Sequence, residues 1–323
     1  MSMQLLNSIK AAKIHGDIMN DLHDKHIVVP GNSINNIVDY IENSIFDKIN
    51  YDSNIPLTGG CAFPVNISVN EIVAHYTSSS KNDDYILKKN DIVKVDFGVH
   101  KNGSIIDSAQ TFHFDSKYDE FVEYSKKCTD YAVSLCGPDV NLGDLGKDIE
   151  EYVKSKEIHI DNKLYQLHTL KELSGHNIGE YLIHKSKALP NCAIKYPVRM
   201  EEGDFFAVEP FISTCAESYY DSPTNLFMVA KNYNNLIYLL CGDELELFNK
   251  IIKQYLTLCF CDKWLEKDID KFDFNIFKKI IDKKIIEEYK TIYVLKDNYV
   301  SQFEHNVYIK SNGIIQLTKN KYY

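Results

Sequence analysis

The chain has 323 residues, of which 44% are apolar and 25% charged, and its formal net charge is −10. This composition fits a soluble globular protein with a large core, and the acidic balance argues against a dominant role in nucleic-acid binding. No apolar run is long enough for a membrane span or a secretory signal. The eight cysteines form no pair of Cys-x-x-Cys motifs, which excludes zinc-finger and disulfide-scaffold folds, so we expect a cytoplasmic protein.

The first two predicted elements are helices. Apolar residues at helical spacing predict a helix from the first residues to about Asp24, and Pro30 and Gly31 break it. Either Asn32 or Ser33 then caps a second helix, which reaches about Lys48. Strands follow to about position 114.

Within these strands, Asp96 and Asp107 lie on either side of the turn Lys101-Asn102-Gly103. Apolar residues on both flanks predict a β-hairpin, which sets the two carboxylates directly opposite each other on one face. Two such charges about 4 Å apart repel by roughly 4 kcal/mol at an effective dielectric constant of ~20, so a proton or a metal cation must offset them. Taken alone, the pair is more typical of a solvated hairpin edge than of a metal site.

The rest of the chain is predicted to contain two more helices, a mixed region, a helical segment and final strands. The predicted spans are helices at 120–135 and 142–156, strands near Glu209, an almost wholly helical segment at 242–288, and strands at about 299–316. Cys259 and Cys261 fall within the helical segment, and we expect both thiols to lie on a helix.

Three later residues change the interpretation of the aspartate pair. His176 lies in Ser174-Gly175-His176-Asn177-Ile178-Gly179, while Glu209 and Glu304 follow buried-type residues, so an unpaired charge at either acid would be costly. Four carboxylates and a neutral imidazole balance two divalent cations. Such an oxygen-rich set without thiolate suits a pair of Mn, Fe, Co or Zn ions better than a structural zinc.

The order and spacing of these residues resemble the methionine aminopeptidases and their pita-bread relatives, and the type 2 branch fits best. The matching segments are Ala62-Phe63-Pro64, Ala74-His75-Tyr76-Thr77, Lys94-Val95-Asp96-Phe97-Gly98-Val99-His100, Gly175-His176-Asn177-Ile178-Gly179 and Gln302-Phe303-Glu304-His305. The long interval from Glu209 to Glu304 matches the inserted helical subdomain of type 2 enzymes.

The resemblance implies a role for each ligand. Asp107 and Glu304 would bridge two metals, Asp96 would bind one of them, and His176 with Glu209 would bind the other. A hydroxide that bridges the metals would attack the first peptide carbonyl, with Glu209 as proton shuttle. The free amine of the substrate would bind the more open metal, so only an N-terminal residue would be removed.

Two histidines and three pocket residues complete the implied site. His75 and His184 match the family's catalytic histidines that contact the substrate but bind no metal. Phe63 and Ile183 match pocket residues that would hold methionine, and Tyr289 would line the next subsite. From the residues alone, His75 is more typical of a hydrogen-bonded loop histidine, and all three pocket residues fit a plain core equally well. The chain departs from the family at Ile212-Ser213-Thr214-Cys215 and Asn225-Leu226-Phe227, which implies a pocket of different shape.

The fold implied is α+β, a pita-bread (creatinase/aminopeptidase) fold with a helical insertion subdomain. We expect residues 1–225 and 297–323 to form the catalytic domain and residues 226–296 the insert. Prolidase-like relatives place a large domain before the catalytic one, whereas 95 residues precede Asp96 here. Catalytically inactive pita-bread homologues act as binding or regulatory proteins, and they are the alternative from another functional class.

The function implied is the removal of the initiator methionine from proteins and peptides by a dinuclear metallo-exopeptidase. Its partners would be nascent polypeptide N-termini that begin with Met, with no membrane and no specific nucleic acid, and we expect a monomer. Ribosome association is an open expectation, because the long charged leader usual in eukaryotic type 2 enzymes does not precede the first predicted helix.

Overall fold

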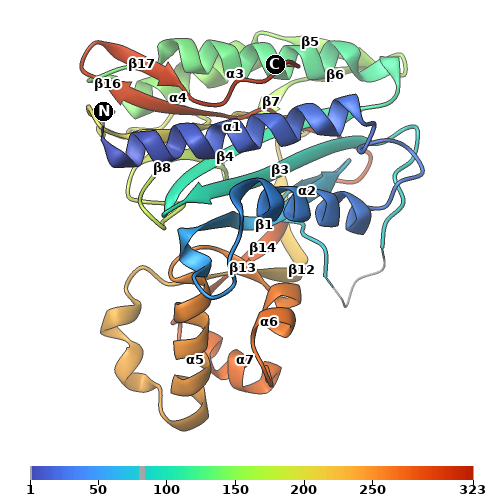
Figure 1. Ribbon diagram of the computed structural model, residues 1–323. Helices are drawn as coiled ribbons and strands as arrows, with labels where there is room; N and C mark the ends of the chain where they lie inside the picture. Colours follow the sequence, from blue (N-terminus) through green and yellow to red (C-terminus); the bar gives the residue numbers. More distant parts are fainter. Residues whose placement is uncertain (1, 80–83, 323) are drawn as a thin grey trace.

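The computed structural model describes residues 2–79 and 84–322. Two halves, each a sheet covered by two helices, lie against each other, and a smaller helical part projects from one side (Figure 1). This arrangement is the pita-bread α+β fold that the sequence implies. Short 3-10 helices lie in connections, at Pro56–Thr58, Ser116–Tyr118, Tyr233–Asn235 and Ile237–Leu239.

In the first half, two helices pack on a three-stranded antiparallel sheet. The helices are α1 (Met3–Asp24) and α2 (Ile34–Ile49), and the strands, in spatial order, are β1 (Gly59–Val69), β3 (Ile92–Lys101) and β4 (Ser104–His113). Every residue of β1 is buried, because helix α2 covers one face and the rest of the molecule covers the other.

Helix α2 shows how the sequence sets the element boundaries. The hydroxyl of Ser33 accepts a hydrogen bond from the backbone N–H of Asn36 at 3.1 Å, so Ser33 rather than Asn32 is the N-cap. At the other end Asn50 adopts the left-handed conformation, with φ of +53°, and closes the helix. Both predicted N-terminal helices are confirmed.

The β3–β4 hairpin corrects one prediction. Asn102 and Gly103 both have positive φ, +47° and +76°, as a two-residue hairpin turn requires. Lys101 is therefore the last residue of β3, and the register places Asp96 opposite Ala109 and Asp107 opposite Gly98. The aspartates are diagonal neighbours rather than a directly opposed pair, although both still point to the same face.

In the second half, helices α3 (Asp119–Leu135) and α4 (Leu142–Lys154) pack against a five-stranded antiparallel sheet and confirm the helices predicted there. In spatial order its strands are β17 (Gly313–Gln316), β16 (His305–Lys310), β10 (Phe205–Val208), β8 (Ser174–Ile178) and β9 (Ala188–Pro190). A three-stranded sheet joins β15 (Val300–Gln302), β11 (Phe211–Ser213) and β7 (His168–Thr169), and β5 (Glu157–Ile160) pairs with β6 (Lys163–Gln166).

The projecting part contains less helix than predicted. Its helices are α5 (Gly242–Tyr255), α6 (Asp262–Asp268) and α7 (Phe274–Asp282), and a sheet in the order β13 (Phe260–Cys261), β12 (Ser218–Val229), β14 (Ile286–Val294), β2 (Ile72–Ala74) joins it to the first half. The prediction that Cys259 and Cys261 lie on a helix is wrong, because α5 ends before them and Cys261 pairs with Leu226 in β12.

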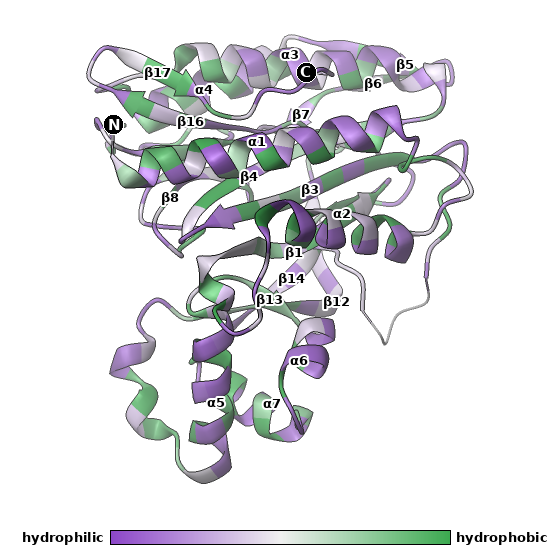
Figure 2. Ribbon diagram, in the orientation of Figure 1, coloured by the Kyte–Doolittle hydropathy of each residue, from purple (hydrophilic) through white to green (hydrophobic). Residues whose placement is uncertain are grey.

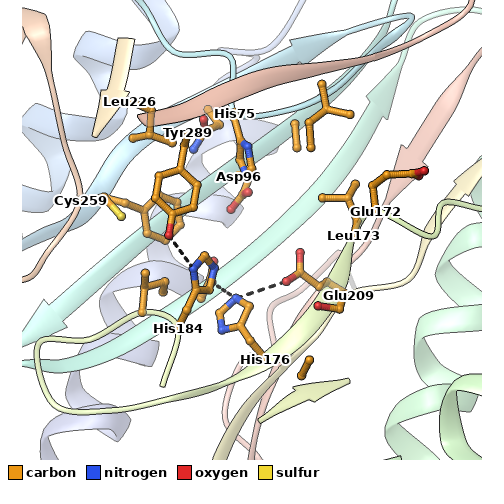
Figure 3. A pocket seen from close by; sticks show the side chains of 18 of the residues that line it. His75, Asp96, Glu172, Leu173, His176, His184, Glu209, Leu226, Cys259 and Tyr289 are labelled. Carbon is orange, nitrogen blue, oxygen red and sulfur yellow. Dashed lines mark hydrogen bonds and ion pairs between the residues drawn. The ribbon is translucent and has the colours of Figure 1, made fainter. Parts of the chain in front are cut away.

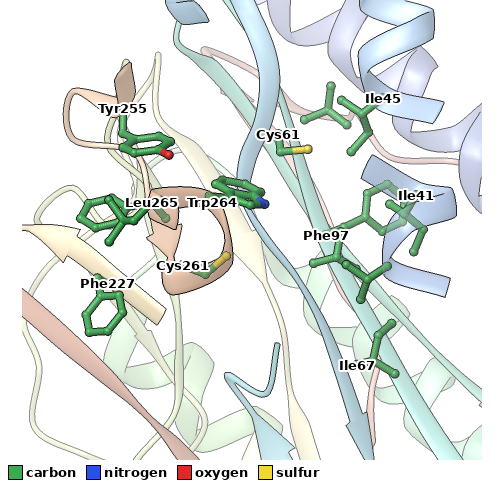
Figure 4. Close-up of a cluster of buried hydrophobic side chains, with 14 of the residues drawn as sticks. Ile41, Ile45, Cys61, Ile67, Phe97, Phe227, Tyr255, Cys261, Trp264 and Leu265 are labelled. Atoms are coloured by element: carbon green, nitrogen blue, oxygen red, sulfur yellow. The ribbon is translucent and has the colours of Figure 1, made fainter. Parts of the chain in front are cut away.

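One hydrophobic cluster runs from the first half into the helical part. Ile41 and Ile45 of α2, Phe97 of β3, and Trp264 and Leu265 of α6 all belong to it (Figure 4). Hydrophobic and hydrophilic positions both occur along the strands β3 and β4 and along the helices (Figure 2). The helical part is thus packed on the first half. The expected division at residues 225 and 226 falls inside β12, and the two-domain description stays a prediction.

Candidate metal centre and pocket

The five predicted ligands come from five separate places in the chain. Asp96 lies on β3, Asp107 on β4, His176 on β8, Glu209 directly after β10, and Glu304 in the short break between β15 and β16. The fold brings all five together where the two halves meet. Oxygen atoms of Asp96, Asp107 and Glu304 lie within 4.8 Å of one another, and Nε2 of His176 lies 3.4 Å from Asp107 and 3.3 Å from Glu209.

His176 comes close to Glu209 because the backbones of β8 and β10 pack closely together. Gly175 precedes His176, and a Cβ atom on it would lie 2.4 Å from the carbonyl oxygen of Ala207 in β10. Only glycine fits there without movement of the backbone. The first glycine of the Gly-His-x-x-Gly segment therefore lets β8, which carries His176, pack directly against β10, which ends at Val208 beside Glu209.

The electrostatics of the cluster follow from burial and from like charge. Burial, together with Asp107 and Glu209, raises the pKa of Asp96 well above its usual value, and burial with the neighbouring carboxylates does the same to Glu304. Burial also raises the pKa of Glu209. For His176, burial lowers the pKa, but the hydrogen bonds to Asp107 and Glu209 outweigh it and raise the pKa to about 10. Without a cation, protons must offset the negative charge.

The donor set fits divalent cations. Oδ1 of Asp96 and Oε1 of Glu304 are buried and have no hydrogen-bond partner among the described residues. Buried carboxylate oxygens are costly without a partner, and a cation is a partner that serves several of them together. Four carboxylates and one imidazole form the ligand set preferred by catalytic first-row metals.

Several supporting residues were missed from the sequence. Nε2 of Gln302 donates to Glu209 at 3.3 Å and to Glu304 at 3.5 Å, and Oδ1 of Asn306 accepts from the backbone N–H of Asp107 at 2.7 Å. Gln302 stands in a segment that carried the family resemblance, which was the available signal. Asn306 carried no signal, because its partner lies on a distant strand.

A cavity of about 670 Å³ opens beside the cluster (Figure 3). The predicted histidines, His75 and His184, line it, as do the predicted pocket residues Phe63, Ile183 and Tyr289. Several residues that were not predicted from the sequence to line a pocket also line it, among them Leu226, Cys259, Phe211 and Asn66. The walls are mainly apolar and aromatic, with the ligand cluster at one end, which is the composition of a small-molecule or side-chain pocket.

The two non-ligand histidines face each other across Tyr289. The hydroxyl of Tyr289 lies 3.1 Å from Nδ1 of His184, and the ring of His75 meets the Tyr289 ring edge-on, with centroids 5.5 Å apart. His184 also stands edge-on to His176 at 4.3 Å. Burial lowers the pKa of His184 well below its usual value, and the charge of His176 lowers it further, so His184 is neutral. Burial lowers the pKa of His75 as well.

The chain is similar to known metallopeptidases. The model of metallopeptidase family M24 matches residues 8–237. Methionine aminopeptidase 2 of Dictyostelium discoideum is 33% identical over 93% of this chain and 67% of that protein, and methionine aminopeptidase 2 of Debaryomyces hansenii is 35% identical over 92% and 70%.

Solved structures show the same fold at low identity. Methionine aminopeptidase from Thermotoga maritima superimposes with a TM-score of 0.63 at 20% identity, covering 99% of this chain and 98% of that one. A thermophilic Arx1 superimposes with a TM-score of 0.79 at 14% identity, covering 98% of this chain and 91% of that one.

No helix within residues 2–79 and 84–322 combines the length and apolar character of a membrane span. All eight cysteines are free thiols.

Proposed function

The chain belongs to metallopeptidase family M24, and we propose that within it the chain is a type 2 methionine aminopeptidase. Such an enzyme is a hydrolase that removes the initiator methionine from the N-terminus of proteins and peptides. The observation that carries the proposal is the convergence of Asp96, Asp107, His176, Glu209 and Glu304 at one end of a mainly apolar pocket.

We propose two divalent cations per chain. Asp107 and Glu304 would contact both, Asp96 would hold one, and His176 with Glu209 would hold the other. When bound, the cations would polarise the first peptide carbonyl and lower the pKa of the attacking water. The oxygen-rich donor set suits manganese, iron, cobalt or zinc.

Other residues of the pocket would bind and orient the substrate. Phe63, Ile183 and the ring of Tyr289 offer apolar contacts to a methionine side chain. His184 and His75 would hydrogen-bond the scissile amide and the developing tetrahedral centre. A carboxylate oxygen of Glu209 would take a proton from the attacking water and pass it to the leaving amine.

The alternative is a catalytically inactive homologue that acts by binding. The thermophilic Arx1 shares the fold, but at 14% identity it says nothing about activity here. Retention of all five ligands, with buried acids beside a pocket, favours catalysis. Monomeric state, ribosome association, nascent-chain partners and cytoplasmic location stay predictions.

The test is release of free methionine from Met-Ala-Ser by the purified protein with added manganese or cobalt. We expect release, and we expect Glu304→Ala to abolish it, because both cations would lose a carboxylate that they share. Glu202→Gln is the matched control, since Glu202 is an exposed acid outside the cluster, and it should behave as the unaltered protein. If the folded protein released no methionine with manganese, cobalt, iron or zinc, the binding-protein alternative would replace this proposal.

A further inference from the structure

A bulge in β1 turns an unexpected side chain into the pocket. In the β1–β3 ladder, Phe63 stands opposite Gly98 and Asn66 stands opposite Asp96, so three steps along β1 match two along β3. In a regular strand, residues 63 and 66 would point to opposite faces. The extra residue instead places Phe63 and Asn66 on the same face as Asp96, and both line the pocket.

The hydrogen bonds of Asn66 leave one atom unused. Its Nδ2 donates to the carbonyl oxygen of Pro64 at 3.0 Å, which pins the amide across the bulge. Its Oδ1 is buried and accepts no hydrogen bond among the described residues, although the side chain is only 4% exposed. A buried amide oxygen with no partner is uncommon in a folded protein, because it loses its bond to water without replacement.

The neighbours of Asn66 determine which hydrogen-bond donor could reach its Oδ1. Directly opposite residues in an antiparallel pair have Cβ atoms about 5 Å apart, so Asn66 and Asp96 are side-by-side in the pocket wall. Oδ1 of Asp96 is also buried without a hydrogen-bond partner. On its other side β1 pairs with the segment after His75, where Asn66 bridges Thr77. Asn66 thus lies between the ligand cluster and one of the pocket histidines.

We propose that Asn66 is a substrate-binding residue whose Oδ1 accepts an N–H hydrogen bond from the α-amine of the substrate. This inference rests on the proposed aminopeptidase function. An amide oxygen can only accept, so its partner must donate, and the methionine side chain has no donor. The free N-terminus has at least two N–H groups and is present in every substrate of an aminopeptidase.

The contact would also add to selectivity for a free N-terminus. An N-acetylated or internal peptide bond has a single N–H and carries a carbonyl group where the amine would sit. The acyl group would have to fit against the buried wall beside Asn66 and Asp96, and its carbonyl oxygen, an acceptor, would find two more acceptors there, which disfavours binding of such a substrate.

The experiment compares two ligands that differ by the amine alone. Methionine and 4-(methylthio)butanoic acid share the side chain and the carboxylate, and calorimetry on the manganese-loaded protein measures both affinities. We expect Asn66→Ala to weaken methionine binding roughly 5- to 30-fold, the loss of one hydrogen bond to a buried acceptor, and to leave binding of the acid unchanged. Asn66→Ser, with a hydroxyl too short to reach, should give the same result.

Asn225→Ala is the matched control. Asn225 is a second buried asparagine with an unpartnered Oδ1 and an Nδ2 bonded to a backbone carbonyl, here that of Thr77 at 2.9 Å, but it is not among the residues that line the pocket. Its removal should leave the ratio of the two affinities unchanged. Unchanged binding of the deaminated acid also shows that each variant is folded.

The outcomes separate this inference from the proposed function. If Asn66→Ala binds the two ligands with the wild-type ratio, or lowers manganese affinity while the ratio stays constant, Asn66 does not bind the amine and the inference is wrong. If the unaltered protein neither releases methionine from Met-Ala-Ser nor prefers methionine to the deaminated acid, the proposed function itself has failed.

Discussion

Tyr289 is the side chain that connects the two proposed catalytic histidines. Its hydroxyl lies 3.1 Å from Nδ1 of His184, and its ring contacts that of His75. A hydrogen bond at Nδ1 fixes the orientation and tautomer of an imidazole, and thereby determines what the other nitrogen presents to its neighbours. If His184 acts on the scissile amide through Nε2, its rate contribution depends on this hydroxyl.

We therefore expect Tyr289→Phe to lower kcat for Met-Ala-Ser about 5-fold, because one hydrogen bond contributes roughly 1 kcal/mol. KM should change less, since the apolar ring remains in the pocket. Steady-state kinetics on the manganese-loaded protein measure both. The control is Tyr293→Phe on the same strand, whose hydroxyl donates to the carbonyl of Ser222 at the surface. Full activity of Tyr289→Phe would show that His184 needs no such support.

The five ligands could be predicted from the sequence, but the residues that hydrogen-bond to them could not. Glu209 and Glu304 could be found because an acid after buried-type residues is costly without a partner. Gln302 and Asn306 are ordinary polar residues in sequence, and their roles depend on partners 93 and 199 positions away. Asn66 was missed for a related reason, because only the bulge in β1 turns it toward the pocket.

Helix α2 and helix α6 are joined by a buried carboxylate. Glu42 of α2 accepts a hydrogen bond from Nε1–H of Trp264 in α6 at 3.0 Å and is only 8% exposed. Burial raises the pKa of Glu42 to about 7, against the opposing effects of Lys263, of the Trp264 bond and of Lys267, while Asp39 raises it further. The contact between the first half and the helical part therefore depends on pH.

A raised folded-state pKa means that the folded chain binds the proton more tightly than the unfolded chain. The contribution of Glu42 to stability is then complete below about pH 4.5 and is lost as the pH rises to about 7. We expect Glu42→Gln, which can still accept from Trp264, to remove this loss. At pH 8 it should raise the free energy of unfolding by about 1–3 kcal/mol, since one pKa unit corresponds to 1.36 kcal/mol.

Denaturant unfolding from pH 4 to pH 8 measures the effect. Asp47→Asn is the control, because Asp47 is an exposed acid on the same helix, and its profile should match that of the unaltered chain. A Glu42→Gln profile parallel to the wild-type profile would mean that Glu42 ionises normally in the folded chain.

Element types were predicted well where periodicity was strong and partners were local. Helices α1 to α4 follow from apolar spacing and caps, and each forms within its own segment. The segment from 242 to 288 failed because Leu256, with φ of +53°, ends α5 and because β13 and β14 exist only by pairing with the distant β12. The hairpin register failed by two residues because the turn is Asn102-Gly103, with Lys101 still in β3, so Asp96 faces Ala109 instead of Asp107.

For the whole molecule, the ligand cluster is a junction between the two halves. Asp96 and Asp107 come from the sheet under α1 and α2, whereas His176, Glu209 and Glu304 come from strands under or beside α3 and α4. The raised pKa values of Asp96, Glu209 and Glu304 mean that the metal-free fold loses stability as the pH rises, because these acids ionise against one another. Bound cations would offset the repulsion between the ionised carboxylates and would link the two halves.

We therefore expect manganese to stabilise the entire fold, and to do so more at pH 8 than at pH 6, because bound metal must displace protons from the carboxylates. At a free manganese concentration of about 100 times Kd, the free energy of unfolding should rise by roughly 2.7 kcal/mol. Thermal unfolding with and without manganese, at both pH values, measures the difference. Asp107→Asn should lose the manganese effect, since Asp107 contacts His176 and stands beside Asp96 and Glu304, whereas Glu202→Gln should keep it. Equal stability with and without manganese at pH 8 would mean that the five side chains do not bind the ion in solution.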